Sequence, residues 1–188
     1  GLPLAQVQAF SIDDASTTEI DDALSVTGLG TGSVTLGIHI AAPGLAVQPG
    51  DAIDAVARQR MSTVYMPGYK ITMLPDDVVQ HYTLGAGQPR PTVTLYVTFD
   101  EATLEITATH SRLERTPIAH NLRIDAIEPT VTAEWLAAPA DTPEAHPALH
   151  QHRAALAFVW RLAQHLKAQR EVVRGKPETF TRPDYNFS

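Results

Sequence analysis

Alternating hydrophobic and polar residues give the clearest structural signal in this chain. Residues 92–99 alternate along their whole length, which predicts a strand, and residues 104–109 resume the pattern after a short turn. Residues 23–27 and 33–40 also alternate, and they flank the glycine-rich residues 28–32. Two alternating runs joined by a short glycine-rich segment predict a β-hairpin.

A long helix is predicted near the C-terminal end, where apolar residues recur every three or four positions instead of every second position. Residues 150–171 carry apolar side chains at helical spacing, and the proline-containing residues 137–147 before them predict a loop. The apolar stripe consists of Leu149, Leu156, Val159, Leu162 and Leu166. The basic residues that fall off this stripe, and are therefore expected in solvent, are Arg153, Arg161, Lys167 and Arg170. The sequence therefore predicts an amphipathic helix with one solvated face.

The remaining segments are shorter. A strand end is predicted at residues 9–12, a helix capped by Asp51 at residues 51–61, loops with prolines at residues 65–69 and 73–77, and an extended segment at residues 180–187. Strands on both sides of helices indicate a mixed α/β fold. We divide residues 1–188 into an acidic-loop and sheet core (1–136), a proline-rich loop (137–147) and an amphipathic helix with the extended segment after it (148–188).

The composition of the chain excludes several classes of protein. The chain has no cysteine, which excludes disulfides and thiolate metal sites and favours a reducing, cytoplasmic location. It has no apolar run of about 18 residues or more and no signal-peptide pattern, so no membrane association is expected.

The acidic residues are unevenly placed. The net charge is −7, and residues 1–57 contain no Lys or Arg. A region of this kind repels phosphate unless cations bind to it.

Four carboxylates fall within one polar segment between predicted strands: Asp13, Glu19, Asp21 and Asp22. Crowded carboxylates raise one another's pKa, and a bound divalent cation removes that cost. Oxygen ligands without His or Cys favour Mg²⁺ or Mn²⁺ over zinc. The spacing alone also fits a solvated surface turn or a calcium site, although the central glycine of the usual calcium loop is missing.

The acidic segment resembles a family signature. The run SIDDASTTEIDDAL at residues 11–24 resembles the opening of the ribonuclease II-type (RNB) catalytic domain, in which an aspartate after an isoleucine is followed by further acids six, eight and nine positions on. Further blocks follow in the family's order: GIHIAAP at residues 37–43, STVYMPGYKITMLP at residues 62–75 and RPDY at residues 182–185. The resemblance therefore spans nearly the whole chain.

The resemblance implies a fold, a reaction and roles for individual residues. The implied fold is the N-terminal part of an RNB domain, with a largely antiparallel curved sheet flanked by helices. Asp13 and Asp22 are the implied metal ligands, and Asp21 orients water or metal. Glu19 stands where the family more often has aspartate, so the carboxylate at this position is one methylene further from the backbone. Tyr65 falls on the aromatic residue that stacks against a nucleotide, although packing beside Pro67 explains a tyrosine equally simply.

The implied activity is Mg²⁺-dependent hydrolysis of single-stranded RNA from its 3′ end, which releases nucleoside 5′-monophosphates. The family's catalytic domain is about twice as long, and its second half supplies a catalytic arginine that has no counterpart here. OB-type RNA-binding modules are missing at both ends. We therefore expect the isolated chain to be weak or inactive, and its apolar strand faces to be exposed and to favour self-association.

Two other functions stay open at this point. A non-catalytic RNB-like domain that binds RNA or a partner protein is favoured by Glu19 and by the missing arginine segment. A calcium-stabilised structural domain is the third class. The histidines show no convincing zinc spacing, and relatives place a second tyrosine near Asn121, where this chain has no aromatic residue.

Overall fold

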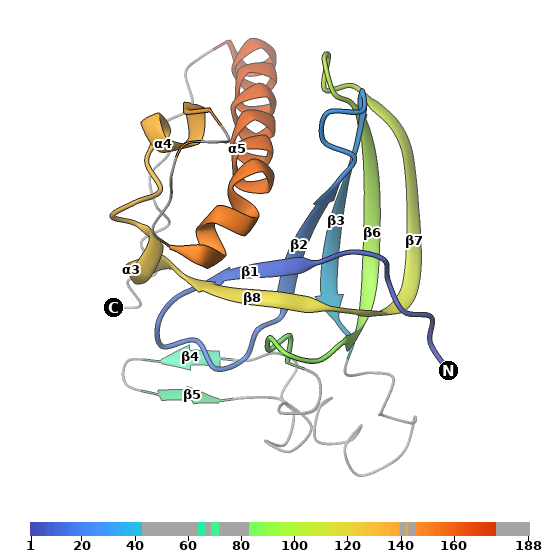
Figure 1. The fold of residues 1–188 in the computed structure, drawn as a ribbon, viewed down its shortest axis with the longest axis vertical. Helices are drawn as coiled ribbons and strands as arrows, with labels where there is room; N and C mark the ends of the chain where they lie inside the picture. The colour runs from blue at the N-terminus through green and yellow to red at the C-terminus, as the bar shows by residue number, and fades with distance from the viewer. Residues whose placement is uncertain (43–63, 67–68, 72–82, 140–141, 143–145, 176–188) are drawn as a thin grey trace.

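The structure is a computed structural model, and it describes residues 1–42, 64–66, 69–71, 83–139, 142 and 146–175. Six strands form one sheet (Figure 1): β1 (Ala9–Asp13), β2 (Asp22–Thr27), β3 (Ser33–Ala41), β6 (Arg90–Asp100), β7 (Ile106–Thr116) and β8 (Ile118–Arg123). Their order across the sheet is β7-β6-β3-β2-β1-β8. Every neighbouring pair is antiparallel except β1 with β8. The predicted mixed fold with a largely antiparallel sheet is therefore confirmed.

The predicted hairpins follow from their turn chemistry. Gly28 joins β2 to β3 with a φ of +86°, and a Cβ there would lie 2.3 Å from the Ser33 carbonyl oxygen. The Glu101 carboxylate accepts hydrogen bonds from the backbone N–H groups of Gly30 and Gly32. The loop after β6 therefore supports the turn between β2 and β3, and the two hairpins stabilise each other.

Helix α5 (Pro147–Arg174) covers one face of the sheet (Figure 1). Its N-terminus is capped by His146, whose side chain accepts a hydrogen bond from the Leu149 N–H group, and Gly175 ends it in the left-handed conformation. Within the apolar stripe, Leu149, Leu156 and Leu162 are buried. The predicted helix is confirmed, beginning three residues earlier than expected.

Arg153 is a correction to the predicted solvent face of this helix. Its side chain is only 3% exposed, and its guanidinium lies 4.5 Å from the centre of the Trp135 ring. It donates hydrogen bonds to the carbonyl oxygens of Trp135 and Thr142. The short helix α4 (Ala133–Ala137) covers this side of α5, so a position that reads as exposed on an isolated helix is buried here.

Several elements differ from the sequence prediction. Strand β7 begins two residues later than predicted and extends to Thr116, and β8, α3 (Ile124–Ile127) and α4 were not predicted. The loop predicted at residues 65–69 contains parts of a two-stranded hairpin, in which β4 (Val64–Met66) pairs with β5 (Tyr69–Ile71). The helix predicted at 51–61, the loop at 73–77 and the extended segment at 180–187 lie outside the described residues.

Part of the sheet face that α5 covers is open to solvent. Val34 and Phe99 lie on this face beneath Phe158 of the helix. Further along the same strands, Ile40, Val93 and Leu113 are neighbours in register and are 50%, 43% and 48% exposed. These three residues form an exposed apolar row across β3, β6 and β7, and we call it the apolar row below. No described helix is both long enough and apolar enough to cross a bilayer.

Candidate functional site

The acidic residues occupy two neighbouring strand ends and the loop between them. Asp13 is the last residue of β1 and Asp22 the first of β2, and the two strands are paired antiparallel. We call residues 14–21, which connect them, the acidic loop. Because paired strands hold their adjoining ends close together, the fold itself brings Asp13 and Asp22 near each other.

The Asp13 carboxylate interacts with nearby polar and charged side chains. Its carboxylate accepts a hydrogen bond of 2.5 Å from the Ser11 hydroxyl. Burial raises the pKa of the Asp13 carboxyl above its usual value, and the charges of Asp22 and Asp14 raise it further, whereas the Ser11 bond and the charge of Arg123 act in the opposite direction. Asp13 and Asp22 therefore form a pair within electrostatic reach of each other.

Asp21 and Glu19, the other two predicted acids, differ in their exposure to solvent. Asp21 is exposed, and its backbone carbonyl accepts a hydrogen bond from the Ala41 N–H group. Glu19 is only 7% exposed. No three or more His, Cys, Asp or Glu residues in the described part of the chain are grouped so that they could hold a metal ion. The structure thus brings Asp13 and Asp22 together but does not form a shared four-carboxylate cluster, and the ligand roles stay predictions.

The Asp13–Asp22 pair is chemically suited to Mg²⁺. This ion is usually bound by one or two carboxylates, with waters and substrate phosphates completing its shell. Two neighbouring carboxylates at an exposed loop meet that requirement, and a three-acid cage is not needed. Among the described residues, the two carboxylates could supply part of the coordination shell of a Mg²⁺ ion, and they do not form an all-protein metal cage.

Residues that the sequence analysis missed hold the acidic loop in place. Arg123, at the end of β8, donates hydrogen bonds of 2.9 Å to the carbonyl oxygens of Asp14 and Thr17. Asn121, on the same strand, donates to the Ser11 hydroxyl at 2.9 Å. Both act across more than 100 positions of sequence, so no local pattern could have identified them. Residues 118–123 could have been singled out only if their pairing with the strand at residues 9–13 had been known.

Tyr65 is the one predicted substrate-binding residue. The backbone of residue 65 pairs with residue 70 in the β4–β5 hairpin. The side chain of Tyr65 lies outside the described part of the structure. Its predicted role therefore stays a prediction.

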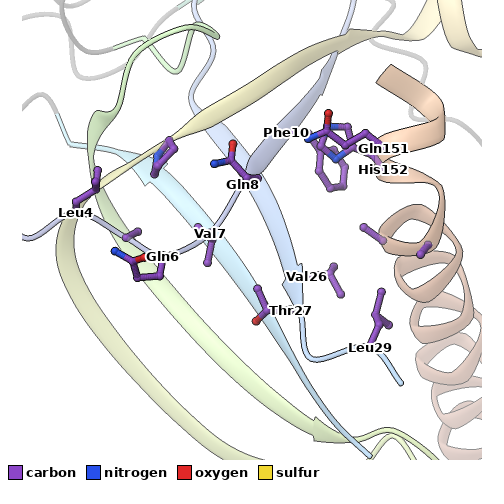
Figure 2. A pocket seen from close by; sticks show the side chains of 14 residues that line it. Leu4, Gln6, Val7, Gln8, Phe10, Val26, Thr27, Leu29, Gln151 and His152 are labelled. Carbon is purple, nitrogen blue, oxygen red and sulfur yellow. The ribbon is translucent and has the colours of Figure 1, made fainter. Parts of the chain in front are cut away.

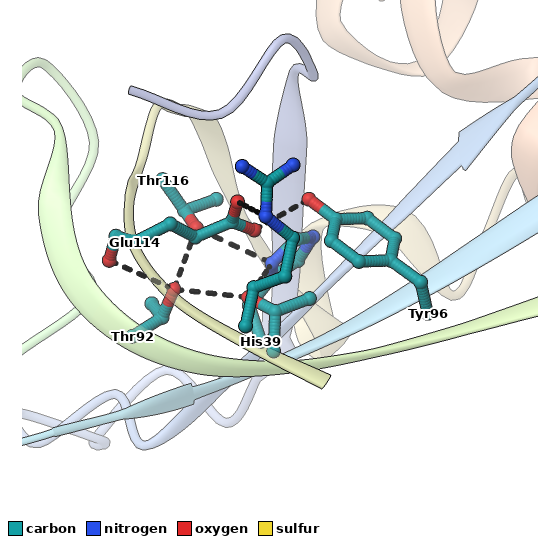
Figure 3. Close-up of polar contacts among 7 residues, drawn as sticks. His39, Thr92, Tyr96, Glu114 and Thr116 are labelled. Atoms are coloured by element: carbon teal, nitrogen blue, oxygen red, sulfur yellow. Dashed lines mark hydrogen bonds and ion pairs between the residues drawn. The ribbon is translucent and has the colours of Figure 1, made fainter. Parts of the chain in front are cut away.

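A network of buried polar side chains (Figure 3) lies on the face of the sheet that points away from α5. His39 is fully buried, and its ring nitrogens lie 2.8 Å from the hydroxyl oxygens of Ser25 and Thr94. The Tyr96 hydroxyl donates a hydrogen bond of 2.5 Å to the buried carboxylate of Glu114. Burial lowers the pKa of His39 to about 4, and the Glu114 charge opposes that shift only in part. All of these groups are buried, and their hydrogen bonds join β2, β3, β6 and β7.

Gly37 leaves the space in which the His39–Ser25 contact forms. A Cβ at Gly37 would lie 2.4 Å from the Ser25 hydroxyl oxygen and 2.7 Å from His39 Nε2. We expect Gly37→Ala to lower the free energy of unfolding by about 1–3 kcal/mol, because the added methyl group overpacks a filled interior. Gly85→Ala is the matched control, since a Cβ there meets nothing within 4 Å. Equal urea midpoints for both variants would contradict this account.

A second histidine lines a cavity between the N-terminal segment, β2 and α5. The cavity has a volume of about 580 Å³ and is lined by Gln6, Gln8, Phe10, Leu29 and His152, among others (Figure 2). His152 Nε2 lies 2.8 Å from His120 Nδ1, and burial followed by the nearby His120 lowers the pKa of His152 to about 4. None of the four predicted acids lines this cavity.

These two histidines predict a pH-dependent stability. The pKa values of His39 and His152 are both lowered from 6.5 to about 4, so the unfolded chain binds protons that the folded chain does not. The free energy of unfolding should therefore fall as the pH drops from about 6.5 towards 4, by up to about 3 kcal/mol for each histidine. Asp13, with its raised pKa, contributes in the opposite direction.

Urea denaturation at several pH values between 7 and 4.5 measures this effect. His39→Gln should remove about half of the pH dependence, because His152 still titrates. Gln164→Ala, at an exposed position of α5 that carries no titratable group, is the control and should leave the slope unchanged. A free energy of unfolding that stays constant across this range would show that neither histidine is held neutral by the fold.

Comparison with known proteins places the chain in a family. The sequence model of the RNB domain matches residues 3–185. Exoribonuclease 2 of Serratia proteamaculans is 42% identical over 96 residues, which make up 50% of this chain and 15% of that protein. This chain therefore spans only a small part of the length of that curated relative.

Solved structures agree in fold. RNase R of Mycoplasma genitalium, determined in complex with ribose-methylated single-stranded RNA, has a TM-score of 0.72 at 21% identity, over 91% of this chain and 25% of that one. Yeast Ssd1, described as a pseudonuclease, has a TM-score of 0.71 at 22% identity, over 94% of this chain and 19% of that one. At these identities the structures show the fold alone. With the domain match over nearly all of its length, this chain belongs to the RNB domain family.

Proposed function

We propose that this chain is the acid-bearing N-terminal part of the catalytic domain of a cytoplasmic 3′-to-5′ exoribonuclease, which hydrolyses single-stranded RNA to nucleoside 5′-monophosphates with Mg²⁺. Membership of the RNB family and the exoribonuclease relative support an RNA-degrading function. The single observation that carries the proposal is the Asp13–Asp22 pair at adjoining strand ends.

Each acidic residue has a proposed role. Asp13 and Asp22 hold the cation, and Asp21, which is exposed beside them, orients the attacking water. When bound, Mg²⁺ would offset the negative charge of the scissile phosphate and favour ionisation of that water. Glu19 is nearly buried, so we assign it to supporting the loop or to coordination after the loop moves. Tyr65 is proposed to stack on a base of the RNA near the scissile bond.

The charge distribution supports a cation-dependent mode of RNA binding. Residues 1–57 carry acidic residues and no Lys or Arg, so they repel a phosphate backbone by themselves. Cations between the carboxylates and a phosphate remove that repulsion. RNA binding near the acidic loop is therefore expected to depend on divalent cations and not on monovalent salt alone.

Digestion of a 5′-labelled single-stranded RNA by the natural full-length protein tests the proposal. With Mg²⁺ we expect shortening from the 3′ end and release of nucleoside 5′-monophosphates, and chelation should stop the reaction. Asp21→Asn in the full-length protein should bind the RNA and leave it intact. Undiminished digestion in the presence of chelator, or digestion from the 5′ end, would refute the proposal.

A non-catalytic RNB-like domain is the alternative function. It is favoured by Glu19, which stands where the family more often has aspartate and is nearly buried, and the pseudonuclease Ssd1 has the same fold. In that case the wild-type protein would bind the labelled RNA but not shorten it at any Mg²⁺ concentration, and Asp21→Asn would bind equally well.

We propose that this chain is followed and flanked by other parts of a longer protein. These partners are the remaining half of the catalytic domain and OB-type RNA-binding modules. The 188-residue chain alone is then expected to digest RNA weakly or not at all, because the proposed catalytic arginine lies outside it. Vigorous stepwise digestion by the purified chain would contradict that expectation.

Self-association of the isolated chain is expected through the apolar row. Exposed aliphatic side chains side by side on three strands favour burial against a second surface. Sedimentation should show oligomers of the wild-type chain, and Val93→Lys should shift them to monomer. Thr109→Lys, at an exposed polar position of β7, is the control and should leave the oligomers in place. A wild-type chain that remains monomeric at high concentration would contradict this prediction.

A further inference from the structure

The acidic loop is tied to β8 through its backbone. The Arg123 side chain uses one nitrogen, Nη1, to donate to the carbonyl oxygens of Asp14 and Thr17, each at 2.9 Å. These two carbonyl groups lie in the first half of the loop, three residues apart. One guanidinium therefore fixes the path of the chain directly after Asp13.

A second contact reaches the Asp13 carboxylate itself. The Asn121 amide nitrogen donates to the Ser11 hydroxyl at 2.9 Å, and that hydroxyl donates to Asp13 Oδ2 at 2.5 Å. Ser11 is only 2% exposed, so little water competes for this chain of bonds. The Ser11 hydroxyl has a single proton, and because Asn121 supplies the bond that it accepts, that proton points towards Asp13.

The far end of the acidic loop is fixed through the same asparagine. Asn121 also donates to the Leu84 carbonyl oxygen at 2.9 Å and accepts from the Ala86 N–H group at 2.7 Å. Leu84 in turn donates its N–H group to the Ile20 carbonyl oxygen at 2.9 Å, just before Asp21 and Asp22. Strand β8 thus braces both ends of a loop whose like charges would otherwise drive it apart.

We propose that Arg123 and Asn121 are positioning residues for the acidic pair: Arg123 sets the backbone of the acidic loop, and Asn121 orients Asp13 through Ser11. The proposal rests on the proposed function, since it concerns how the carboxylates of that site are held. Neither residue touches the substrate in this role. Side chains that orient metal-ligating carboxylates are commonly worth about 10–100-fold in metal affinity or activity.

Two variants of the natural full-length protein separate the contacts. Arg123→Gln shortens and neutralises the side chain that holds the two loop carbonyls. Asn121→Asp keeps the size of the side chain and an acceptor for Ala86, but it adds a negative charge and removes the amide donor to both Ser11 and the Leu84 carbonyl oxygen. Arg161→Gln is the matched control, because Arg161 also donates to a backbone carbonyl, that of Ala102, far from the acidic loop. Arg123→Lys, which keeps the charge, is the conservative variant for rescue.

Three readouts are needed: Mn²⁺ affinity by electron paramagnetic resonance, amide hydrogen exchange of residues 14–21, and kcat and KM on single-stranded RNA. For Arg123→Gln and Asn121→Asp we expect Mn²⁺ affinity and kcat to fall about tenfold or more, with KM within about twofold of wild type. Exchange should accelerate in the acidic loop for Arg123→Gln and not elsewhere. Arg123→Lys should recover part of the affinity, and Arg161→Gln should match wild type.

The outcomes separate the two proposals. If wild type binds Mn²⁺ and digests RNA, and both variants do so equally well, the positioning role is overturned and the proposed function stands. The role is also overturned if the variants lose activity only in step with thermal stability, as a purely structural brace would. If wild type neither binds Mn²⁺ nor digests RNA, the proposed function fails. If amide exchange of residues 14–21 is then also unchanged in Arg123→Gln, the contact between Arg123 and the acidic loop is overturned as well.

Discussion

Asp22→Asn is expected to lower kcat for RNA hydrolysis by the full-length protein by about three orders of magnitude. The substitution removes the charge of one of the two carboxylates proposed to hold the cation, and a loss of about 4 kcal/mol of transition-state stabilisation corresponds to that factor. Stability should change little, because Asp22 is exposed at the start of β2. Initial rates at saturating RNA, with melting temperatures in parallel, measure both quantities.

The control for this prediction is Asp125→Asn, at an exposed acid in the first turn of α3. It changes the net charge by the same amount without touching the acidic loop, so its kcat should equal that of wild type. A reduction of less than about tenfold for Asp22→Asn would remove Asp22 from the metal site.

Phe10→Ala is expected to cost about 3–5 kcal/mol of folding stability. Phe10 is 1% exposed and packs in the core cluster with Leu122 and Leu149, which joins β1 and β8 to α5. Its ring centre lies 4.6 Å from that of His152. The substitution leaves a cavity between the sheet and the helix, at the strand that ends in Asp13.

Urea denaturation with Ile12→Ala as the control tests this prediction. Ile12 lies two residues further along the same strand and is 42% exposed, so its truncation should cost less than about 1 kcal/mol. Similar losses for the two variants would mean that β1 is not packed against α5 as described. We also expect Phe10→Ala to lower the rate of RNA hydrolysis by the full-length protein, because Asp13 is the last residue of β1.

The local elements were predictable because their signals are local. The β2–β3 hairpin and β6 showed alternation, and α5 showed an apolar stripe, although the helix continues beyond the predicted end at residue 171 to Arg174. Strand β8 was missed because only Ile118 and Leu122 are buried in it, and a spacing of four residues fits one face of a helix as well as one face of a strand. Its conformation follows from parallel pairing with β1, a contact between distant parts of the chain.

The candidate site was predictable to a similar degree. Spacing grouped Asp13, Glu19, Asp21 and Asp22, and only the family resemblance singled out Asp13 and Asp22 among them. The placement of these two residues at adjoining strand ends follows from the antiparallel pairing of β1 with β2. Spacing did not reveal that Glu19 is buried, nor that Arg123 and Asn121 brace the loop from β8. Those features depend on tertiary packing, as does the burial of Arg153 against Trp135.

The central claim is that Asp13 and Asp22 share a divalent cation. Crystals of the full-length protein grown with Mn²⁺, and measured at the manganese absorption edge, test it most directly. The claim predicts one anomalous peak within about 2.0–2.4 Å of carboxylate oxygens of both Asp13 and Asp22. It would be contradicted if both side chains turned into solvent and no peak lay between them at high Mn²⁺ concentration.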